Sequence, residues 1–152
     1  MIRWEQALCA GLAVTAWGAP NALADDTRVR NYLEYGMAVH AAAGYVRERT
    51  IPDLETPLRL DHPHLWSIEL NEGVNYRVYG ACDDACADLD MEIYGADGAL
   101  VERDSARDDT PFVQITPTQS GRHFVRLWLY ACAAESCAVA ARVMSGGSPA
   151  PR

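Results

Sequence analysis

Two different periods of apolar and polar residues divide the chain into an N-terminal part and a longer C-terminal part. Over residues 27–49 the pattern is close to one core-facing position every 3.6 residues, which predicts a helix. Asp25 or Asp26 can cap its start, and Pro52 closes it. The core-facing positions of this helix are Val29, Leu33, Met37, His40, Ala43 and Val46.

After residue 54 the period falls to two, and turn residues recur every 8–12 positions, as in an all-β sandwich. Strands are predicted at 66–70, 76–81, 89–93, 100–102, 112–116, 123–131 and 138–144. Asp90 and Glu92 alternate with apolar residues and are predicted to face solvent. The fold class is therefore mostly β: a jelly-roll-like antiparallel β-sandwich of seven or eight strands. The helix is expected to pack against it or to cover an edge.

The first 24 residues read as an export signal. A short basic start precedes an apolar run over residues 8–17, and Ala22-Leu23-Ala24 has the small-x-small pattern of a cleavage site. The apolar run is too short for a membrane anchor, which needs about 18 residues. We therefore expect cleavage after Ala24 and a periplasmic or secreted protein without membrane insertion. The remaining chain divides into a helix and linker (25–54), a β-sandwich (55–144) and a flexible tail (145–152).

Four cysteines follow the predicted cleavage site, and an even number in an oxidising compartment indicates two disulfides. Three pairings are open. The short spacings favour local bridges, 82–86 and 132–137, and the alternative is a four-thiolate zinc site. The residues concerned are Cys82, Cys86, Cys132 and Cys137.

The full chain has a formal charge of −8, and this charge is concentrated in one segment. Residues 83–109 hold ten acidic residues and two arginines, which alone gives −8, so the rest of the exported chain is neutral. This charge argues against a nucleic-acid partner. The segment is either a solvated acidic face or a source of oxygen ligands for a calcium cofactor. The candidate ligands are Asp83, Asp84, Asp88, Asp90, Asp97 and Asp104.

The run GACDDACADLDMEIYGADG at residues 80–98 resembles the bacterial pre-peptidase C-terminal domain family. Asp104, the Asp109-Thr110-Pro111 step and residues 120–126 continue the similarity, which extends over residues 65–144. The resemblance implies a jelly-roll-like sandwich and a secreted binding or stabilising module. Family members usually follow a secreted peptidase, and none fits here, so a stand-alone version is expected. The resemblance transfers no ligand.

Candidate catalytic groups are few. Neither Gly-x-Ser-x-Gly nor His-Glu-x-x-His occurs. His62 and His64, with Asp61, form a weak candidate transition-metal site, but they lie in a proline-containing loop where solvated polar residues are ordinary. Asp88 and Asp90 share one side of a strand and could act as a glycosidase pair, although no sugar cleft is indicated. His40 and His123 are predicted to be structural.

The leading hypothesis is an exported, non-enzymatic module that binds a protein or an extracellular polymer. A calcium-dependent version is the first alternative, and a small hydrolase that uses carboxylates or the His62/His64 pair is the second. A set of aromatic residues could form a contact platform, although strand aromatics are more often core. The set is Trp66, Tyr76, Tyr79, Trp128 and Tyr130.

Overall fold

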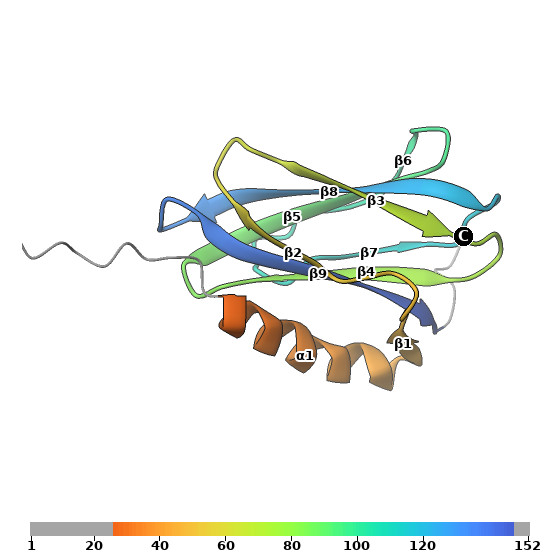
Figure 1. The fold of residues 1–152 in the computed structure, drawn as a ribbon, viewed down its shortest axis with the longest axis horizontal. Helices are drawn as coiled ribbons and strands as arrows, with labels where there is room; N and C mark the ends of the chain where they lie inside the picture. The colour runs from red at the N-terminus through yellow and green to blue at the C-terminus, as the bar shows by residue number, and fades with distance from the viewer. Residues whose placement is uncertain (1–25, 148–152) are drawn as a thin grey trace, which may run out of the picture.

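The computed structural model describes residues 26–147, which form two antiparallel sheets and one helix (Figure 1). The predicted signal segment, its cleavage site and residues 148–152 lie outside the described residues. The order of elements is α1 (Asp26–Ala42), β1 (Tyr45–Arg47), β2 (Leu54–Leu58), β3 (His64–Leu70), β4 (Tyr76–Cys82), β5 (Cys86–Tyr94), β6 (Leu100–Asp104), β7 (Phe112–Ile115), β8 (Gly121–Cys132) and β9 (Cys137–Gly146).

The two sheets confirm the prediction of a mostly β sandwich with one N-terminal helix. One sheet has the order β1-β9-β4-β7, with β2 also paired to β9, and the other has the order β3-β8-β5-β6. β8 is an interior strand of its sheet and β7 an edge strand. The described residues form nine strands rather than seven or eight, because β1 and β2 were not predicted.

The helix ends at Ala42, so the prediction that it continues to residue 49 is wrong. Gly44 adopts a left-handed φ of 86°, which a glycine reaches without steric cost and which ends the helix. Tyr45 then begins β1 and is 2% exposed, whereas Ala43 and Val46, two of the predicted core positions, are exposed. The chain leaves the helical period because β1 pairs with the end of β9.

The two ends of the predicted sandwich also need correction. β2 begins at Leu54 and contains Pro57. An edge strand tolerates a proline, because the side of the strand that has no neighbouring strand needs no backbone N–H donor. Ser145 and Gly146, predicted to belong to a flexible tail, lie in β9 and pair with Val46 and Tyr45.

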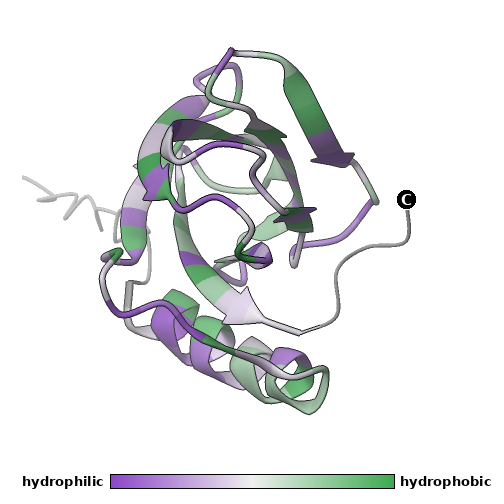
Figure 2. Ribbon diagram, turned by 90° about the vertical axis from the view of Figure 1, so that its right-hand side faces the viewer, coloured by the Kyte–Doolittle hydropathy of each residue, from purple (hydrophilic) through white to green (hydrophobic). Residues whose placement is uncertain are grey.

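Most of the core lies between the sheets, and a second apolar cluster lies between α1 and the five-stranded sheet. The second cluster contains Val29 and Leu33 of α1, with Tyr45, Tyr79 and Met144 of the sheet. The end view shows α1 against one sheet only (Figure 2). The helix therefore covers a face of the sandwich rather than an edge.

Both predicted disulfides are present, Cys82–Cys86 and Cys132–Cys137, which excludes the four-thiolate zinc site. Each one spans a connection at which the chain crosses from one sheet to the other, β4 to β5 and β8 to β9. The two crossings lie at the same end, where Cys86 and Cys132 are cross-strand partners. The disulfides therefore tie the two sheets together at that end.

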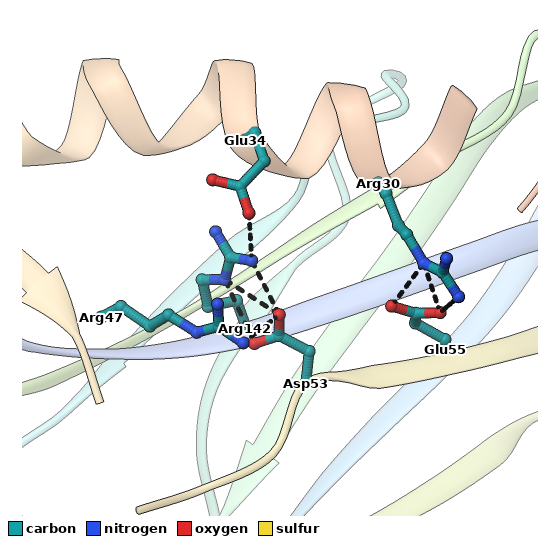
Figure 3. A network of polar contacts seen from close by, with 6 residues as sticks. All are labelled: Arg30, Glu34, Arg47, Asp53, Glu55 and Arg142. Carbon is teal, nitrogen blue, oxygen red and sulfur yellow. Dashed lines mark hydrogen bonds and ion pairs between the residues drawn. The ribbon is translucent and has the colours of Figure 1, made fainter. Parts of the chain in front are cut away.

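A network of ion pairs holds α1 and the 47–53 segment to β9 (Figure 3). Arg142 is 3% exposed, and its Nη2 donates to Glu34 Oε1 at 2.6 Å and to Asp53 Oδ2 at 2.7 Å. Arg47 Nη2 donates to the same Asp53 oxygen at 2.8 Å. Burial opposes the charge of Arg142, but the bonds to Asp53 and Glu34 outweigh it and raise the pKa of Arg142 above its usual range.

His40 lies on the buried side of α1, which agrees with a structural role. It is 6% exposed, and its Nδ1 lies 3.0 Å from Nη1 of Arg77, the cation that faces it. Its ring also contacts Tyr79, with centroids 4.7 Å apart. Burial, with a smaller contribution from the Arg77 charge, lowers the pKa of His40 to about 4. His40 is therefore neutral in the folded protein at pH 5, whereas in the unfolded chain it is protonated.

This difference predicts a loss of stability in mild acid. Because the unfolded state binds the His40 proton first, stability falls as the pH drops from about 6.5 toward 4. Between pH 7 and pH 4.5 the His40 contribution is about 2.5 kcal/mol at most. In His40→Gln, which keeps an acceptor for Arg77 but cannot titrate, the difference in unfolding free energy between these pH values should shrink by this amount. Urea unfolding at both pH values measures it, and an unchanged difference would contradict the assignment.

Candidate ligand-binding face

The outer faces of the two sheets differ. α1 lies on the outer face of the five-stranded sheet, where it contacts β1, β4 and β9. No helix among residues 26–147 lies on the outer face of the four-stranded sheet. This second face is therefore a sheet surface that no described helix covers.

A row of cross-strand partners runs over the middle of this open face. The strand register places Leu65, Arg126, Glu92 and Arg103 side by side on β3, β8, β5 and β6. Glu92 is fully buried, so the prediction that it faces solvent is wrong. Its carboxylate accepts hydrogen bonds from Arg103 Nε at 2.6 Å, from Arg126 Nη1 at 3.1 Å and from Tyr94 Oη at 2.5 Å. These groups come from three strands and cover it.

The pKa of Glu92 shows that the pairing dominates its environment. Burial alone would raise this pKa, but the hydrogen bonds from Tyr94, Arg126 and Arg103 together lower it. Glu92 is therefore ionised in the folded protein and holds Arg126 in a fixed position on the sheet. This arrangement gives the open face an ordered guanidinium group at its centre.

A cleft of about 510 Å³ lies beside Arg126, toward the end of β8. Its walls come from β8 and from the 60–63 turn that precedes β3. The Arg126 guanidinium carbon lies 4.6 Å from the centroid of the Trp128 ring, and Tyr130, two residues further, is 69% exposed. We call this site the β8 cleft; its lining residues are Leu60, Asp61, Pro63, Arg126, Trp128, Leu129 and Tyr130.

The backbone of Asp61, in the wall of the β8 cleft, is strained. Its φ is 63°, the only left-handed value for a non-glycine residue among the described residues. The turn is closed by His62 N, which donates to Arg59 O at 3.2 Å. Glycine is the usual residue at a turn position with positive φ, whereas a side chain there costs free energy. The strained backbone therefore lies in the wall of the cleft, which Asp61 helps to line.

We therefore expect Asp61→Gly to raise the free energy of unfolding by about 0.5–1 kcal/mol, because glycine removes the backbone strain of the folded state. This gain exceeds the cost of the greater conformational freedom that glycine gives the unfolded chain. Gly98 offers the matched control, since its φ is 79° and no atom lies within 4 Å of an added Cβ. Gly98→Asp should destabilise by a similar amount through backbone strain alone. Urea unfolding measures both, and a less stable Asp61→Gly would show that the Asp61 side chain makes a stabilising contact instead.

The five aromatic residues considered as a platform are not all on this face, and two of them are core residues, as is more common for strand aromatics. Tyr76 and Tyr79 are 2% and 4% exposed and belong to the apolar clusters, and Trp66 packs partly buried against the main core. Only Trp128 and Tyr130 lie on the open face. The aromatic residues differ in exposure because successive residues of β3, β4 and β8 point alternately toward and away from the core.

The six aspartates predicted as calcium ligands lie in different places. Asp83 is buried and accepts from Ala138 N at 2.8 Å; Asp84 pairs with Arg28; Asp97 accepts from Ala99 N at 3.0 Å. Asp104 accepts from Ala106 N and Phe112 N at 3.1 and 3.0 Å. In residues 26–147 no three His, Cys, Asp or Glu side chains are grouped as a metal site would require. His62 and His64 are therefore not part of such a group either. Calcium binding stays a prediction.

Asp88 and Asp90, the remaining two, lie buried on the outer side of β5 at 8% and 6% exposure. The prediction that Asp90 faces solvent is therefore wrong. Asp88 Oδ1 has no hydrogen-bond partner among the described residues. Burial raises the pKa of both carboxyls, and for Asp90 the neighbouring Asp88 charge raises it further. Protonation of this pair in acid therefore stabilises the folded protein, whereas acid destabilises it through His40.

His123, the fourth histidine, lies in β8 and is 2% exposed. Its Nδ1 donates to Gly121 O at 2.9 Å, so its position agrees with a structural role. His62 Nδ1 lies 3.0 Å from Leu60 O in the exposed turn. The hydrogen bonds of the His62 and His123 rings go to backbone oxygens, whereas His40 bonds to Arg77.

No family model and no curated protein matches this chain. Among solved structures, the chain is similar to an acetyl xylan esterase, Est2A, from the rumen bacterium Butyrivibrio proteoclasticus. The sequence identity is 12%, the TM-score is 0.37, and the match covers 71% of this chain and 34% of that chain. We draw no functional argument from a likeness at this level. The similarity of residues 65–144 to the pre-peptidase C-terminal family stays a prediction.

No helix within residues 26–147 combines the length and the apolar character needed to cross a bilayer.

Proposed function

We propose that this protein is an exported, non-catalytic binding module that holds a protein or an extracellular polymer at the β8 cleft. The observation that carries this proposal is that an exposed aromatic side chain, an ordered guanidinium and the strained Asp61 turn line one cleft on the open sheet face. Export is supported by the two disulfides, which are typical of proteins outside the cytoplasm.

The chemistry of the cleft suits recognition. Trp128 and Tyr130 offer rigid aromatic surface with polar tips, a combination enriched in binding hot spots. Arg126 presents planar N–H donors that Glu92 and Trp128 hold in place, and Asp61 lines the same cleft. Because Glu92 and Trp128 hold the Arg126 guanidinium before binding, little side-chain entropy of this residue is lost when a ligand is held.

The test is a binding screen of the exported protein against immobilised polysaccharides and extracellular proteins, followed by substitution at the cleft. With the ligand so found, Tyr130→Ala and Trp128→Ala should each weaken binding by about 30-fold, the loss typical of an aromatic hot spot. Tyr32→Ala is the matched control, because Tyr32 is a 39% exposed tyrosine on α1, at the other sheet. Equal affinities of Tyr130→Ala, Trp128→Ala and the unsubstituted protein would show that the ligand binds elsewhere.

A further inference from the structure

The four cysteines of residues 26–147 form one cluster at the end of the sandwich where both disulfide-bridged sheet crossings lie (Figure 1). Cys82, Cys86 and Cys137 belong to the main core cluster, and Cys132 packs against it. The two bridges are therefore neighbours in the fold, although each joins a different pair of strands. A thiolate released from one bridge is close to the sulfur atoms of the other.

The strand register gives Cys86 and Cys132 the relation of a cross-strand disulfide. They are direct partners in the antiparallel pair of β5 and β8. Ala133 N donates to Ala85 O at 2.7 Å, and a bond in this flanking position marks the two cysteines as a non-hydrogen-bonded pair. The Cα atoms of such a pair lie about 4.5 Å apart, within the range of about 4.4–6.8 Å that disulfides span. A bridge between Cys86 and Cys132 therefore fits the folded backbone.

The other two cysteines do not have this relation. The register of β4 and β9 pairs Cys82 with Val139, so Cys137 is two residues away from the partner position. Diagonal neighbours of this kind have Cα atoms about 7–8 Å apart, which is too far for a bridge unless the backbone moves. Exchange between the two native bridges therefore has one favoured product on this backbone, a bridge between Cys86 and Cys132 with Cys82 and Cys137 left as thiols.

Exposure decides where a reductant can begin. Cys132 is partly exposed, whereas Cys82 and Cys137 are 0% exposed and Cys86 is 6% exposed. Thiol–disulfide exchange needs access of the attacking thiolate to one sulfur of the bridge. A thiol from solution therefore meets the cluster at the Cys132 sulfur.

We infer that the four cysteines form a redox-sensitive switch, in which a small thiol reduces the bridge between Cys132 and Cys137 and the remaining bridge then moves to Cys86 and Cys132. A thiolate of the reductant attacks Cys132 Sγ, the bond to Cys137 breaks, and Cys137 takes up a proton. A second reductant thiolate attacks the reductant sulfur of this mixed disulfide, which forms the reductant's own disulfide and frees the Cys132 thiolate.

The Cys132 thiolate then attacks Cys86 Sγ. The new bond between Cys86 and Cys132 forms as the bond to Cys82 breaks, and Cys82 leaves as a thiolate that takes up a proton. In sum, two thiols of the reductant are oxidised to a disulfide and one disulfide of the protein is reduced. The exchange step itself consumes no further reductant.

The switch changes what the bridges hold together. Each native bridge spans a crossing between the sheets, whereas Cys86 and Cys132 lie on two strands of the same four-stranded sheet. After the exchange no disulfide ties the two sheets at this end. The inference does not depend on what the β8 cleft binds.

Two variants test the exchange without a reductant. Cys137→Ser and Cys132→Ser remove the same native bridge, and each leaves one thiol. In Cys137→Ser the free Cys132 faces Cys86, so at about pH 8, where a thiol is partly ionised, the bridge should move to Cys86 and Cys132. In Cys132→Ser, the matched control, the bridge between Cys82 and Cys86 should stay. Alkylation in acid denaturant and peptide mapping by mass spectrometry identify the bridges.

A Cys137→Ser protein that keeps the bridge between Cys82 and Cys86 overturns the inference. So does a bridge to Cys137 in Cys132→Ser, because exchange would then not follow the cross-strand pair.

The unsubstituted protein keeps the test valid if a serine disturbs folding. It is treated in the folded state with an equimolar amount of dithiothreitol and mapped in the same way. Among molecules with one bridge, most should join Cys86 to Cys132 and carry alkylated Cys82 and Cys137. A majority that keeps Cys82 joined to Cys86 overturns the inference, as does a folded protein whose bridges resist excess thiol.

Amide hydrogen exchange tests the effect on the sheet crossing. Residues 83–85 should exchange faster in Cys137→Ser than in Cys132→Ser, because only Cys132→Ser keeps a bridge across the connection from β4 to β5. Equal exchange in the two variants would overturn the inference that the switch frees this crossing.

Discussion

Replacing Arg142 with methionine is expected to lower the free energy of unfolding by about 3–5 kcal/mol, the loss typical when one partner of a buried ion pair is removed. The Arg142 guanidinium bonds to Asp53 through Nε and Nη2, at 3.1 and 2.7 Å, and the Asp53 side chain is only 11% exposed. Without Arg142, this carboxylate keeps only the half-exposed Arg47. The variant also loses the tie to Glu34 of α1. Chemical denaturation at pH 7 measures the change.

Two further variants separate charge from geometry at this network. Arg142→Lys keeps the charge but not the fork of donors, so it should lose part of the stability and not all of it. In Arg142→Met/Asp53→Leu no buried carboxylate is left without a partner, so the double variant should be more stable than Arg142→Met alone. An Arg142→Met variant within about 1 kcal/mol of the parent would mean that water or relaxation compensates Asp53 fully.

Breaking the two disulfides is expected to have the second large effect, a combined loss of about 4 kcal/mol. Each bridge closes a short ring of the chain, between residues four and five positions apart. In the chain-entropy description such a ring contributes about 2 kcal/mol. Because the two bridges lie next to each other across β5 and β8, their removal also frees both sheet crossings at one end. The loss should therefore exceed the effect of either bridge alone.

Denaturation with and without a reductant measures this loss. The variant Cys82→Ala/Cys86→Ala/Cys132→Ala/Cys137→Ala should give the same low stability in both conditions, which shows that the reductant acts only through the bridges. Cys82 and Cys137 are fully buried, so reduction of the native protein should be slow compared with reduction in urea. Equal stability of oxidised and reduced protein would show that the core alone holds the sheets together.

These two sets of contacts hold different parts of the molecule. The disulfides fix the sheets to each other at one end, and the Arg142 network fixes α1 and the 47–53 segment to β9. Neither set of contacts involves the β8 cleft. Substitutions of the exposed residues at this cleft are therefore expected to change binding with little loss of stability.

Most strands were predictable because their signals are local. In β5, the alternation of Leu89, Met91 and Ile93 with polar residues is enough to identify a strand with one core face. The pairing of the cysteines followed from spacing, since residues four or five apart reach each other across a tight connection. The start of the helix was predictable for the same reason, but its end was not, because pairing of Tyr45 with Gly146 replaces the helical period.

The candidate site was less predictable, because its residues are brought together by strands distant in sequence. Nothing near Glu92 indicates that Arg126, 34 positions away, covers its carboxylate. Likewise, the exposure of Tyr130 and the burial of Tyr76 depend on which side of each strand meets the other sheet. The one available signal was the position of Trp128 and Tyr130 at alternate residues of β8, which places them on one side of the strand.

By itself, the sequence determined the periods of its elements, the existence of one helix and a sandwich, and the two local disulfides, because each depends on residues close along the chain. The tertiary structure decided which polar groups are buried, which aromatics are exposed and where the helix stops. Those outcomes depend on contacts between strands and helix far apart in sequence, and only the folded chain supplies these neighbours.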